Sequence, residues 1–509
     1  MSKSFIRSSS VVALMTFLSR ILGLIRDFVI ARYFGANGLT DAFLVAFRIP
    51  NFFRRLFAEG AFSQAFLPIL ADVKANQSDQ EVQLVINHIA TKLLSVLMLI
   101  TLIAVVLAPV IIFLFAWGFY FNADMTQFHL ASNMLRITFP YLLLISLTAL
   151  SGSILNTYDN FSIPAFTPVL LNISLILSAI FLSKFLSTPI MALAWGVLIG
   201  GVAQLSFQIP FLLKIKRLPK IQFGHHKVLA TLKKRMIPAL FGVSVSQINL
   251  LVDTMIASTL IAGSVSWLYY SDRLLELPLA LIGIALATVA LAKLSNYHSK
   301  KDNKNFIDTI DKALLYALIL GFPACIGLVL LSEELIISLF QYDAFDAFAA
   351  KKTSLSLQAY GSGLMAFIAI KIFAPIFLSR GDTKTPVKAG VVAMTSNVIL
   401  NLILVQFYGH IGLAAATSIS ALINATLLYF FLVQQSIFKF NISFYKMLIK
   451  VIFAVTIMAM YICYFETPIE YYLDSSLSER VLSISRTIII SAVIYFSTLY
   501  TLGIRLKQL

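Results

Sequence analysis

The sequence predicts an all-α polytopic membrane protein, and its composition and apolar patterning both support this fold class. Of its 509 residues, 59% are hydrophobic and 12% are charged, and the mean hydropathy is +0.89. Soluble proteins carry about 25% charged residues. Apolar runs recur along the chain, and a run of ~20 residues is long enough to cross a bilayer as a helix. These features exclude a soluble globular fold.

Fourteen apolar segments are candidate transmembrane helices. No small-residue cleavage site follows the first segment, and its arginines would be unusual in a signal peptide, so we expect a retained helix. Because fourteen is even, both chain ends are expected on one side of the membrane. The segments are 8–33, 38–56 (continuing as an amphipathic stretch to 72), 89–117, 128–155, 163–183, 189–213, 236–260, 264–293, 306–338, 353–379, 386–407, 411–435, 444–465 and 481–504.

Basic residues favour one side of the predicted membrane. If the N-terminus is cytoplasmic, the inner loops hold most lysines and arginines, including the basic stretch 214–235, and the outer loops hold mainly acids. This positive-inside pattern predicts cytoplasmic N- and C-termini. It also explains the net charge of +16 without a nucleic-acid partner. The basic stretch is interpreted as a topology signal, with binding to anionic lipid headgroups as the alternative.

Several features recur on the two sides of residue 225. Segments two and eight read LTDAFLVAFRIPNFF and SVSWLYYSDRLLELP, and both place charges before a proline, Pro50 or Pro278. The loops FSIPAFTP and GDTKTPVKAG also correspond. Two six-helix lobes with one orientation are typical of a transporter whose substrate binds between them. The predicted divisions are an N-lobe 1–217, a C-lobe 218–438, and an appendage 439–509 with segments thirteen and fourteen.

Arginines lie at membrane depth in this predicted topology. A charge near the bilayer centre costs at least ~2.5–3.5 kcal/mol on insertion scales, so it usually faces a partner or a water-filled cavity. Arginine also suits bidentate recognition of phosphate. The sequence therefore predicts a cationic cavity for an anionic substrate. Its candidate substrate-binding residues are Arg20, Arg26, Arg273, Arg54 and Arg55.

Acidic residues accompany these arginines. At ~1.5 Å and 100° per residue, Arg20 and Asp27 share nearly one face of the first helix. Residues three or four apart on a helix share a side, which groups Asp272, Arg273 and Glu276. Such pairs are expected to form gates, or alternatively salt bridges that only stabilise the bundle. The candidate gating residues are Asp27, Asp41, Arg48, Glu59, Asp272 and Glu276.

No catalytic residue or bound cofactor is predicted. Cys325 and Cys463 lie in apolar runs, and there is no CxxC or Cys/His cluster. No GxxxxGK[ST] motif occurs, so the chain is not expected to hydrolyse ATP. A membrane enzyme, such as a cell-wall glycosyltransferase, would need an extramembrane catalytic loop, and no loop is long enough. A purely structural role would not explain charges at membrane depth.

Long motifs of this chain resemble the MurJ/MviN family of lipid II flippases in the MOP exporter superfamily. The similarity is strongest in SRILGLIRDFVIARYFGANGLTDAFLVAFRIPNFFRRLFAEGAFSQAFLPIL (19–70), where FRRLFAEGAFSQAF is highly specific. It continues through 137–174, 242–278 and the motif LFQYDAFDA (339–347). It covers nearly the full length.

The resemblance implies a fold and a function. The fold has fourteen helices in two lobes, with a groove between segments thirteen and fourteen for a polyprenyl tail. The function is to move lipid II, the undecaprenyl-diphosphate-linked disaccharide pentapeptide, from the cytoplasmic to the periplasmic leaflet of the bacterial inner membrane. Cell-wall synthesis proteins are candidate partners. The family's essential arginines match Arg20, Arg26, Arg54 and Arg273, and its conserved acid matches Asp41.

Some members of that family bind sodium, and four residues correspond to the site. They are Asp253, Asn397, Asn401 and Thr417. Asn401 stands where the family has an acidic ligand, which argues against sodium binding, and polar contacts between helices are the alternative. Because no ATP-binding motif occurs, transport is expected to be driven by the membrane potential or by an ion gradient.

Two other transport functions stay open. One is a flippase for O-antigen or another polyprenyl-diphosphate oligosaccharide, which differs only in headgroup. The other is a multidrug or cation exporter, which would need an acidic cavity. The candidate residues include six arginines and five acids, and the arginines at mid-depth favour an anionic substrate.

Overall fold

The computed structural model describes residues 3–55, 62–121, 125–224, 226–465 and 467–504, with side chains except at 3–10, 238–239 and 241–248. In this part of the chain every regular element is helical, which confirms the predicted all-α fold class. Contacts divide the chain into two compact units, Met1–Val265 and Ser266–Leu509. The predicted three-part division into lobes and appendage stays a prediction.

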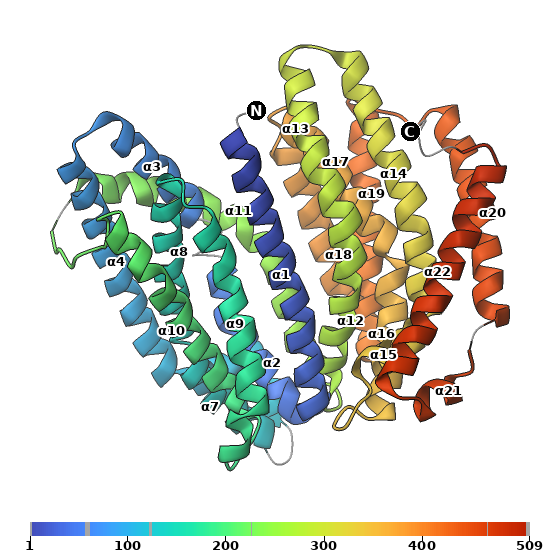
Figure 1. Cartoon of the computed structure of the whole chain (residues 1–509), viewed down its shortest axis with the longest axis horizontal. Helices are drawn as coiled ribbons and strands as arrows, with labels where there is room; N and C mark the ends of the chain where they lie inside the picture. Colours follow the sequence, from blue (N-terminus) through green and yellow to red (C-terminus); the bar gives the residue numbers. More distant parts are fainter. Residues whose placement is uncertain (1–2, 56–61, 122–124, 225, 466, 505–509) are drawn as a thin grey trace. The chain divides into compact units, whose positions relative to one another are not determined.

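The first unit contains the blue to green helices of Figure 1. They are α1 (Lys3–Phe34), α2 (Gly38–Phe53), α3 (Ser63–Asn76), α4 (Asp79–Val106), α5 (Ala108–Phe115), α6 (Gly118–Phe121), α7 (Thr126–Thr138), α8 (Tyr141–Thr157), α9 (Ser162–Ile180), the 3₁₀ helix η2 (Leu182–Phe185), α10 (Met191–Lys214) and α11 (Lys227–Ala257). Helix α11 packs against α3, α4, α5 and α6.

The boundary between the units falls at the start of α12 (Ser264–Pro278). The helices that follow, yellow to red in Figure 1, belong to the second unit. They are the π-helix η3 (Leu279–Ile284), α13 (Ala285–Ser299), α14 (Asn303–Leu330), α15 (Ser332–Phe340), α16 (Ala347–Ser362), α17 (Leu364–Ser379), α18 (Lys384–Tyr408), α19 (His410–Gln434), α20 (Ile442–Phe465), α21 (Ile469–Asp474) and α22 (Leu477–Thr501).

Each of the fourteen predicted segments coincides with a helix or with two or three consecutive helices. By length and composition, ten helices in the described ranges can span a membrane, or eleven if the bent pair α16–α17 is one span. The other three segments are α1, α2 and α11. Arg20, Arg26 and Asp27 interrupt the described apolar run of α1, and α2 has only 16 residues. The chain is therefore a multi-pass membrane protein.

Small residues allow α9 and α10 to pack closely. A Cβ on Gly196 would lie 2.8 Å from Ser178 Oγ, and one on Gly200 would lie 2.8 Å from Leu171 Cδ1. The four-residue spacing of these glycines is typical of close helix pairs in membranes. Ser174 Oγ also donates to the carbonyl of Gly196 at 2.7 Å. Helix α9 in turn packs on α1, which brings Asn172 to the charged part of α1.

Two helices of the second unit are interrupted for identifiable reasons. Pro278 ends α12, because it has no N–H to donate, and the π-helix η3 follows directly. Helices α16 and α17 meet at a 41° bend. At this bend a Cβ on Gly363 would lie 2.5 Å from Ser418 Oγ, so only glycine allows α19 to approach this closely.

The loop between α17 and α18 contains the GDTKTP motif. Asp382 accepts hydrogen bonds from the hydroxyl and the N–H of Thr385 and from the N–H of Lys384. These bonds stabilise the carboxylate, so they hold the pKa of Asp382 below its ordinary value. The aspartate thereby fixes the start of α18.

Helices α20 and α22 pack on each other and on the rest of the second unit, through α14 and α15. Arg480, in the first turn of α22, is buried and donates to the carbonyls of Gln341, Leu473 and Ser475 at 2.9–3.1 Å. Tyr495 OH donates to the carbonyl of Ile319 on α14 at 2.8 Å. Segment fourteen is therefore anchored to this unit by buried hydrogen bonds, and segment thirteen packs on it and on α14.

Candidate functional site

Arg26 and Asp27 on α1 form a buried ion pair. Arg26 donates to Asp27 Oδ1 through Nη2 at 2.7 Å and through Nε at 3.0 Å. Arg26 is 8% exposed and Asp27 is 1% exposed. Because a charge buried without a partner is costly, each residue makes the burial of the other tolerable.

Asn172 on the neighbouring helix α9 binds both Arg26 and the backbone of α1. Its side-chain oxygen accepts from Arg26 Nη1 at 3.0 Å, and its amide donates to the carbonyl of Ser19 at 3.1 Å. A Cβ on Gly23 would lie 3.9 Å from the Asn172 amide nitrogen, so glycine leaves room on this face of α1. The guanidinium of Arg26 is consequently fixed in position and orientation.

Arg20 lies about two helical turns before Asp27 on the same helix. In contrast to Arg26, it is exposed. Arg26 and Arg20 therefore differ in their surroundings: Arg26 is held by protein groups, and Arg20 is accessible to an anionic ligand.

Asp41, in the first turn of α2, is 2% exposed and bonded to the backbone of another segment. Its Oδ2 accepts from the N–H of Gly263 at 2.7 Å, in the turn between α11 and α12. Gly263 has φ +100°, a conformation that favours glycine. The carboxylate thus connects the start of α2 to the end of the first unit.

The remaining predicted residues of segment two are placed differently. Arg48 Nη1 donates to the hydroxyl of Thr254 on α11. Arg54 Nε donates to Asn51 Oδ1 at 3.0 Å, and Arg55 is exposed. Glu59 lies outside the described residues. Arg48 therefore joins α2 to α11, and Arg54 and Arg55 follow at the end of α2.

In the second unit, Arg273 on α12 forms an ion pair with Glu276 at 2.8 Å, across the three-residue spacing noted in the sequence. Its guanidinium also lies over the ring of Tyr269, 5.2 Å from the centroid. The side chains of Arg273 and Glu276 are 35% and 49% exposed, and Asp272 is half-buried. Arg273 is thus oriented by two neighbours on its own helix while remaining accessible. The predicted cationic cavity would bring Arg20 and Arg26 of the first unit together with Arg273 of the second. It stays a prediction.

Three of the four candidate sodium ligands belong to the second unit. Asn401 Nδ2 donates to Asn397 Oδ1 at 3.1 Å, and Asn397 Nδ2 lies 3.4 Å from Thr417 Oγ1. This hydrogen-bonded chain joins α18 to α19 and contains no carboxylate. Asp253 belongs to the first unit. No group of three or more His, Cys, Asp or Glu residues able to hold a metal occurs in the described ranges. The sodium site stays a prediction.

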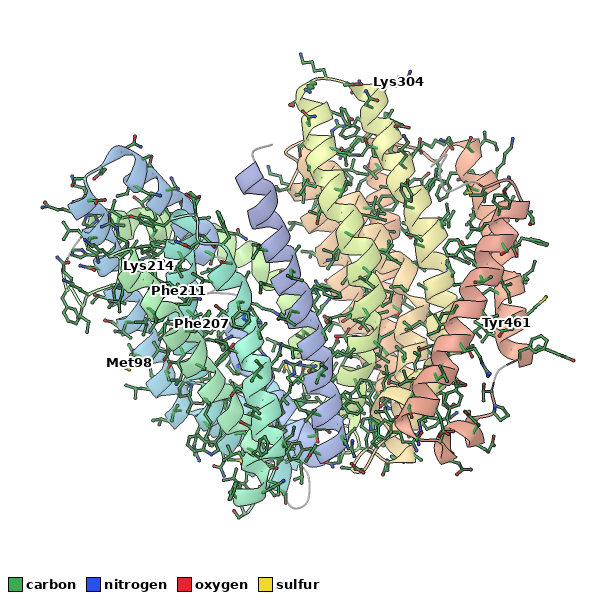
Figure 2. The ribbon with its side chains drawn as sticks, in the orientation of Figure 1. Met98, Phe207, Phe211, Lys214, Lys304 and Tyr461 are labelled. Carbon is green, nitrogen blue, oxygen red and sulfur yellow. The ribbon has the colours of Figure 1, made fainter. Side chains whose placement is uncertain are left out.

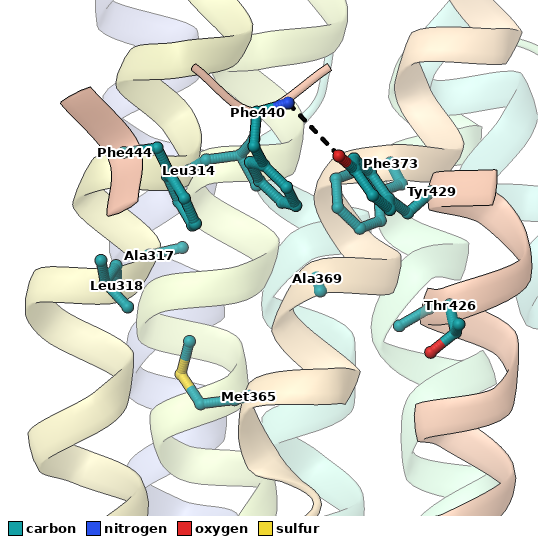
Figure 3. A pocket seen from close by; sticks show the side chains of 11 residues that line it. Leu314, Ala317, Leu318, Met365, Ala369, Phe373, Thr426, Tyr429, Phe440 and Phe444 are labelled. Atoms are coloured by element: carbon teal, nitrogen blue, oxygen red, sulfur yellow. Dashed lines mark hydrogen bonds between the residues drawn. The ribbon is translucent and has the colours of Figure 1, made fainter. Parts of the chain in front are cut away.

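An apolar pocket of about 240 Å³ opens in the second unit near the start of α20 (Figure 3). Phe440 stacks between Tyr429 and Phe444, with ring centroids 4.4 Å and 4.2 Å apart, and its N–H donates to Tyr429 OH at 3.3 Å. Met365 and Ala369 of α17 line the pocket as well. Such a lining suits a hydrocarbon chain and no charged group.

Sequence reasoning missed several residues of these sites. Asn172 and Thr254 are the partners of Arg26 and Arg48, and the signal that marks them is a polar side chain inside an apolar segment. Lys371 is an exposed lysine in the apolar helix α17. Like the candidate arginines, it is a positive charge inside an apolar segment.

Lysine at position 273 is expected to support only in part the transport function that the family resemblance implies. Arg273 presents a planar guanidinium that is held over Tyr269 and paired with Glu276, whereas lysine has a point charge and no fork for two phosphate oxygens. The measurement is growth of a flippase-depleted strain that expresses Arg273→Lys at wild-type level. Full growth would show that charge alone suffices.

Comparisons with known proteins show which family the chain belongs to. The family model described as lipid II flippase MurJ matches residues 30–482. The chain is 43% identical to the probable lipid II flippase MurJ of Vibrio cholerae, over 100% of this chain and 98% of the relative. It is 37% identical to the lipid II flippase MurJ of Burkholderia cenocepacia, over 98% of each.

Solved structures show the same relationship. A lipid II flippase MurJ in an inward closed conformation superposes with a TM-score of 0.81 at 31% identity, covering 96% of this chain and 97% of that chain. A multidrug resistance MATE family transporter of the MOP superfamily, inward-facing, has a TM-score of 0.67 at 14% identity, over 86% and 98% of the two chains. The second similarity concerns the fold alone. The chain belongs to the lipid II flippase MurJ family.

Proposed function

We propose that this protein is a transporter that moves lipid II from the cytoplasmic to the periplasmic leaflet of the bacterial inner membrane. The observation that carries the proposal concerns two arginines of α1: Arg26 is fixed by Asp27 and Asn172, and Arg20 is accessible. In a chain of this family, arginines inside an apolar helix suit the diphosphate of a lipid-linked precursor. The chemistry is binding and release, and no catalytic step on the substrate is part of it.

Each group of residues has a role in this proposal. Arg20 and Arg273 contact the diphosphate, Arg26 contributes a fixed positive charge, and Arg54 and Arg55 guide the headgroup. Charge-assisted hydrogen bonds to phosphate are roughly twice as strong as neutral ones. Asp41 keeps the start of α2 against the turn at Gly263, and release of this bond is a gating step. Alternating access around the bound headgroup completes the cycle.

The polyprenyl tail stays in an apolar environment during this movement. The pocket lined by Phe440 and Phe444 lies at the start of α20 and supports a tail path along the appended helices. Because the tail already lies in hydrocarbon, the pocket adds van der Waals contacts with it and no hydrophobic transfer energy.

The N- and C-termini are placed in the cytoplasm in this proposal. The support is the positive-inside distribution of lysine and arginine. The driving force is the membrane potential, worth ~2.3 kcal/mol per elementary charge per 100 mV, or a sodium gradient. In the latter case Asp253, Asn397, Asn401 and Thr417 are the candidate ligands.

Reconstitution in proteoliposomes tests the function. Fluorescent lipid II is placed in one leaflet, and its appearance in the other leaflet is measured with a membrane-impermeant reagent, with and without sodium and an imposed potential. We expect movement that depends on the protein and that excess unlabelled lipid II suppresses. Suppression by another polyprenyl-diphosphate oligosaccharide or by a cationic drug, and none by lipid II, would contradict the proposal.

A further inference from the structure

The segment between α10 and α11 is an extended strap, residues 217–224, that lies along α4. Three polar residues one turn apart on α4 bind alternate residues of the strap. Gln83 Nε2 donates to the carbonyl of Leu218 at 3.0 Å, Asn87 Oδ1 accepts from the N–H of Lys220 at 2.9 Å, and Thr91 Oγ1 accepts from the N–H of Gln222 at 2.8 Å. The strap therefore has a defined register and a defined direction.

The strap reaches from the start of α4 to the predicted membrane boundary. Its first residue, Arg217, bonds to Asp79 at the start of α4, and Gln222 bonds to Thr91. Twelve helical residues correspond to ~18 Å. The apolar segment predicted from the sequence begins at residue 89, so the strap ends where the bilayer is expected to begin. Gly224, with φ +143°, lies at the end of the strap.

The free side of the strap is apolar at this end. Successive side chains of an extended segment point to opposite sides. Gln222 faces α4 and bonds to Asn87, whereas Ile221 and Phe223 are 71% and 79% exposed. Two exposed large apolar side chains at a predicted membrane boundary fit the interfacial region of a bilayer better than water.

A cavity of about 220 Å³ lies beside the strap. Its lining includes Leu94 of α4, Leu147 and Ser151 of α8, Ile209 of α10, and Lys220 of the strap. Pockets for whole drug-sized ligands measure roughly 300–1,000 Å³, so this cavity holds part of a hydrocarbon chain and no polar headgroup. The helical residues lie inside the predicted spans, and Lys220 is the one cation among the described residues that line the cavity.

Three exposed lysines lie in the strap or within three residues before it in the sequence. Lys214, Lys216 and Lys220 are exposed, and none forms an ion pair with a described residue. Lys214 ends α10 (Figure 2). The neighbouring Arg217 is buried and paired with Asp79. The positive charge of these three lysines is therefore available to an anion at the lipid surface.

We propose that the strap and this cavity form a site for an anionic phospholipid of the cytoplasmic leaflet, separate from the substrate cavity. One acyl chain enters the cavity between α4, α8 and α10, the phosphate binds at Lys220, and Ile221 and Phe223 insert beside the lipid. Occupancy secures the chain connection between α10 and α11 against the first unit.

Native mass spectrometry of the full-length protein tests this site with phosphatidylglycerol and phosphatidylcholine of identical acyl chains. We expect the wild type to retain phosphatidylglycerol in preference. A lysine near an anionic headgroup contributes about 1 kcal/mol, so Lys220→Gln should weaken phosphatidylglycerol binding about fivefold. The matched control is Lys304→Gln, an exposed lysine near the turn between α13 and α14 (Figure 2), and its binding should equal that of the wild type.

A second variant tests the cavity. Ser151→Phe places a ring in the space assigned to the acyl chain, and the folded protein should lose the retained lipid regardless of headgroup. If this variant does not fold, the comparison of Lys220→Gln with Lys304→Gln alone decides whether the proposal holds. Equal binding of both lipids by the wild type would overturn the proposal, as would equal phosphatidylglycerol binding by Lys220→Gln and Lys304→Gln. A folded Ser151→Phe variant that retains phosphatidylglycerol as the wild type does would also overturn it.

Discussion

Alanine at Arg20 or at Arg273 is expected to abolish growth support in a flippase-depleted strain while the protein stays folded in the membrane. Both arginines are accessible, and in the proposed function both bind the diphosphate. Hydrogen bonds to charged groups contribute about 1.5–3 kcal/mol each, so losing one arginine should reduce substrate affinity roughly 10- to 150-fold. Growth and membrane abundance are measured together, because only a loss of growth at normal abundance reports on transport.

Arg136→Ala is the matched control for this experiment. Arg136 is also exposed in the first unit, and it bonds to Asn133 on its own helix at 2.8 Å. We expect growth at the wild-type level from this variant. Normal growth from both Arg20→Ala and Arg273→Ala would contradict the cationic cavity.

Alanine at Arg26 is expected to destabilise the protein as well as to stop transport. Its removal takes the ion pair with Arg26 away from Asp27, which is 1% exposed, and takes this donor away from the Asn172 oxygen. Removing one member of a buried pair typically costs 3–5 kcal/mol, because the other charge stays uncompensated. The measurement is thermal unfolding of purified protein in detergent, with Arg20→Ala as the control on the same helix.

The double variant Arg26→Ala/Asp27→Ala separates the two effects. Removal of both charges takes away the buried carboxylate together with its arginine, so part of the lost stability should return, whereas transport should stay absent. An Arg26→Ala protein that unfolds at the wild-type temperature would show that the pair is not a stabilising element.

Much of the fold could be predicted because the membrane imposes a simple rule. A bilayer requires runs of about 20 apolar residues, and all fourteen predicted segments coincide with helices. The breaks within these segments were harder to predict. The π-helix after Pro278 and the bend at Gly363 depend on how one backbone packs on another, and hydropathy carries no information about this packing.

The candidate arginines could also be predicted, because the free energy of placing a charge inside the bilayer makes an arginine in an apolar run unusual. Their partners could not. Asn172 lies far from Arg26 in the chain, and the acceptor for Gly263 is Asp41, more than two hundred residues away. Only the packing of α9 on α1, and of the α11–α12 turn on α2, brings these groups within hydrogen-bond distance.

By itself, the sequence determined the class of protein, the positions of its helices and the charges that set it apart from an ordinary helix bundle. The tertiary structure decided which of these charges are held and which are accessible: Arg26 is buried and held by Asp27 and Asn172, and Arg20 on the same helix is exposed. The physical reason is that burial and hydrogen bonding depend on contacts between helices. The strap was beyond sequence reasoning for the same reason, since a basic loop acquires a register and a cavity only when it lies against α4, α8 and α10.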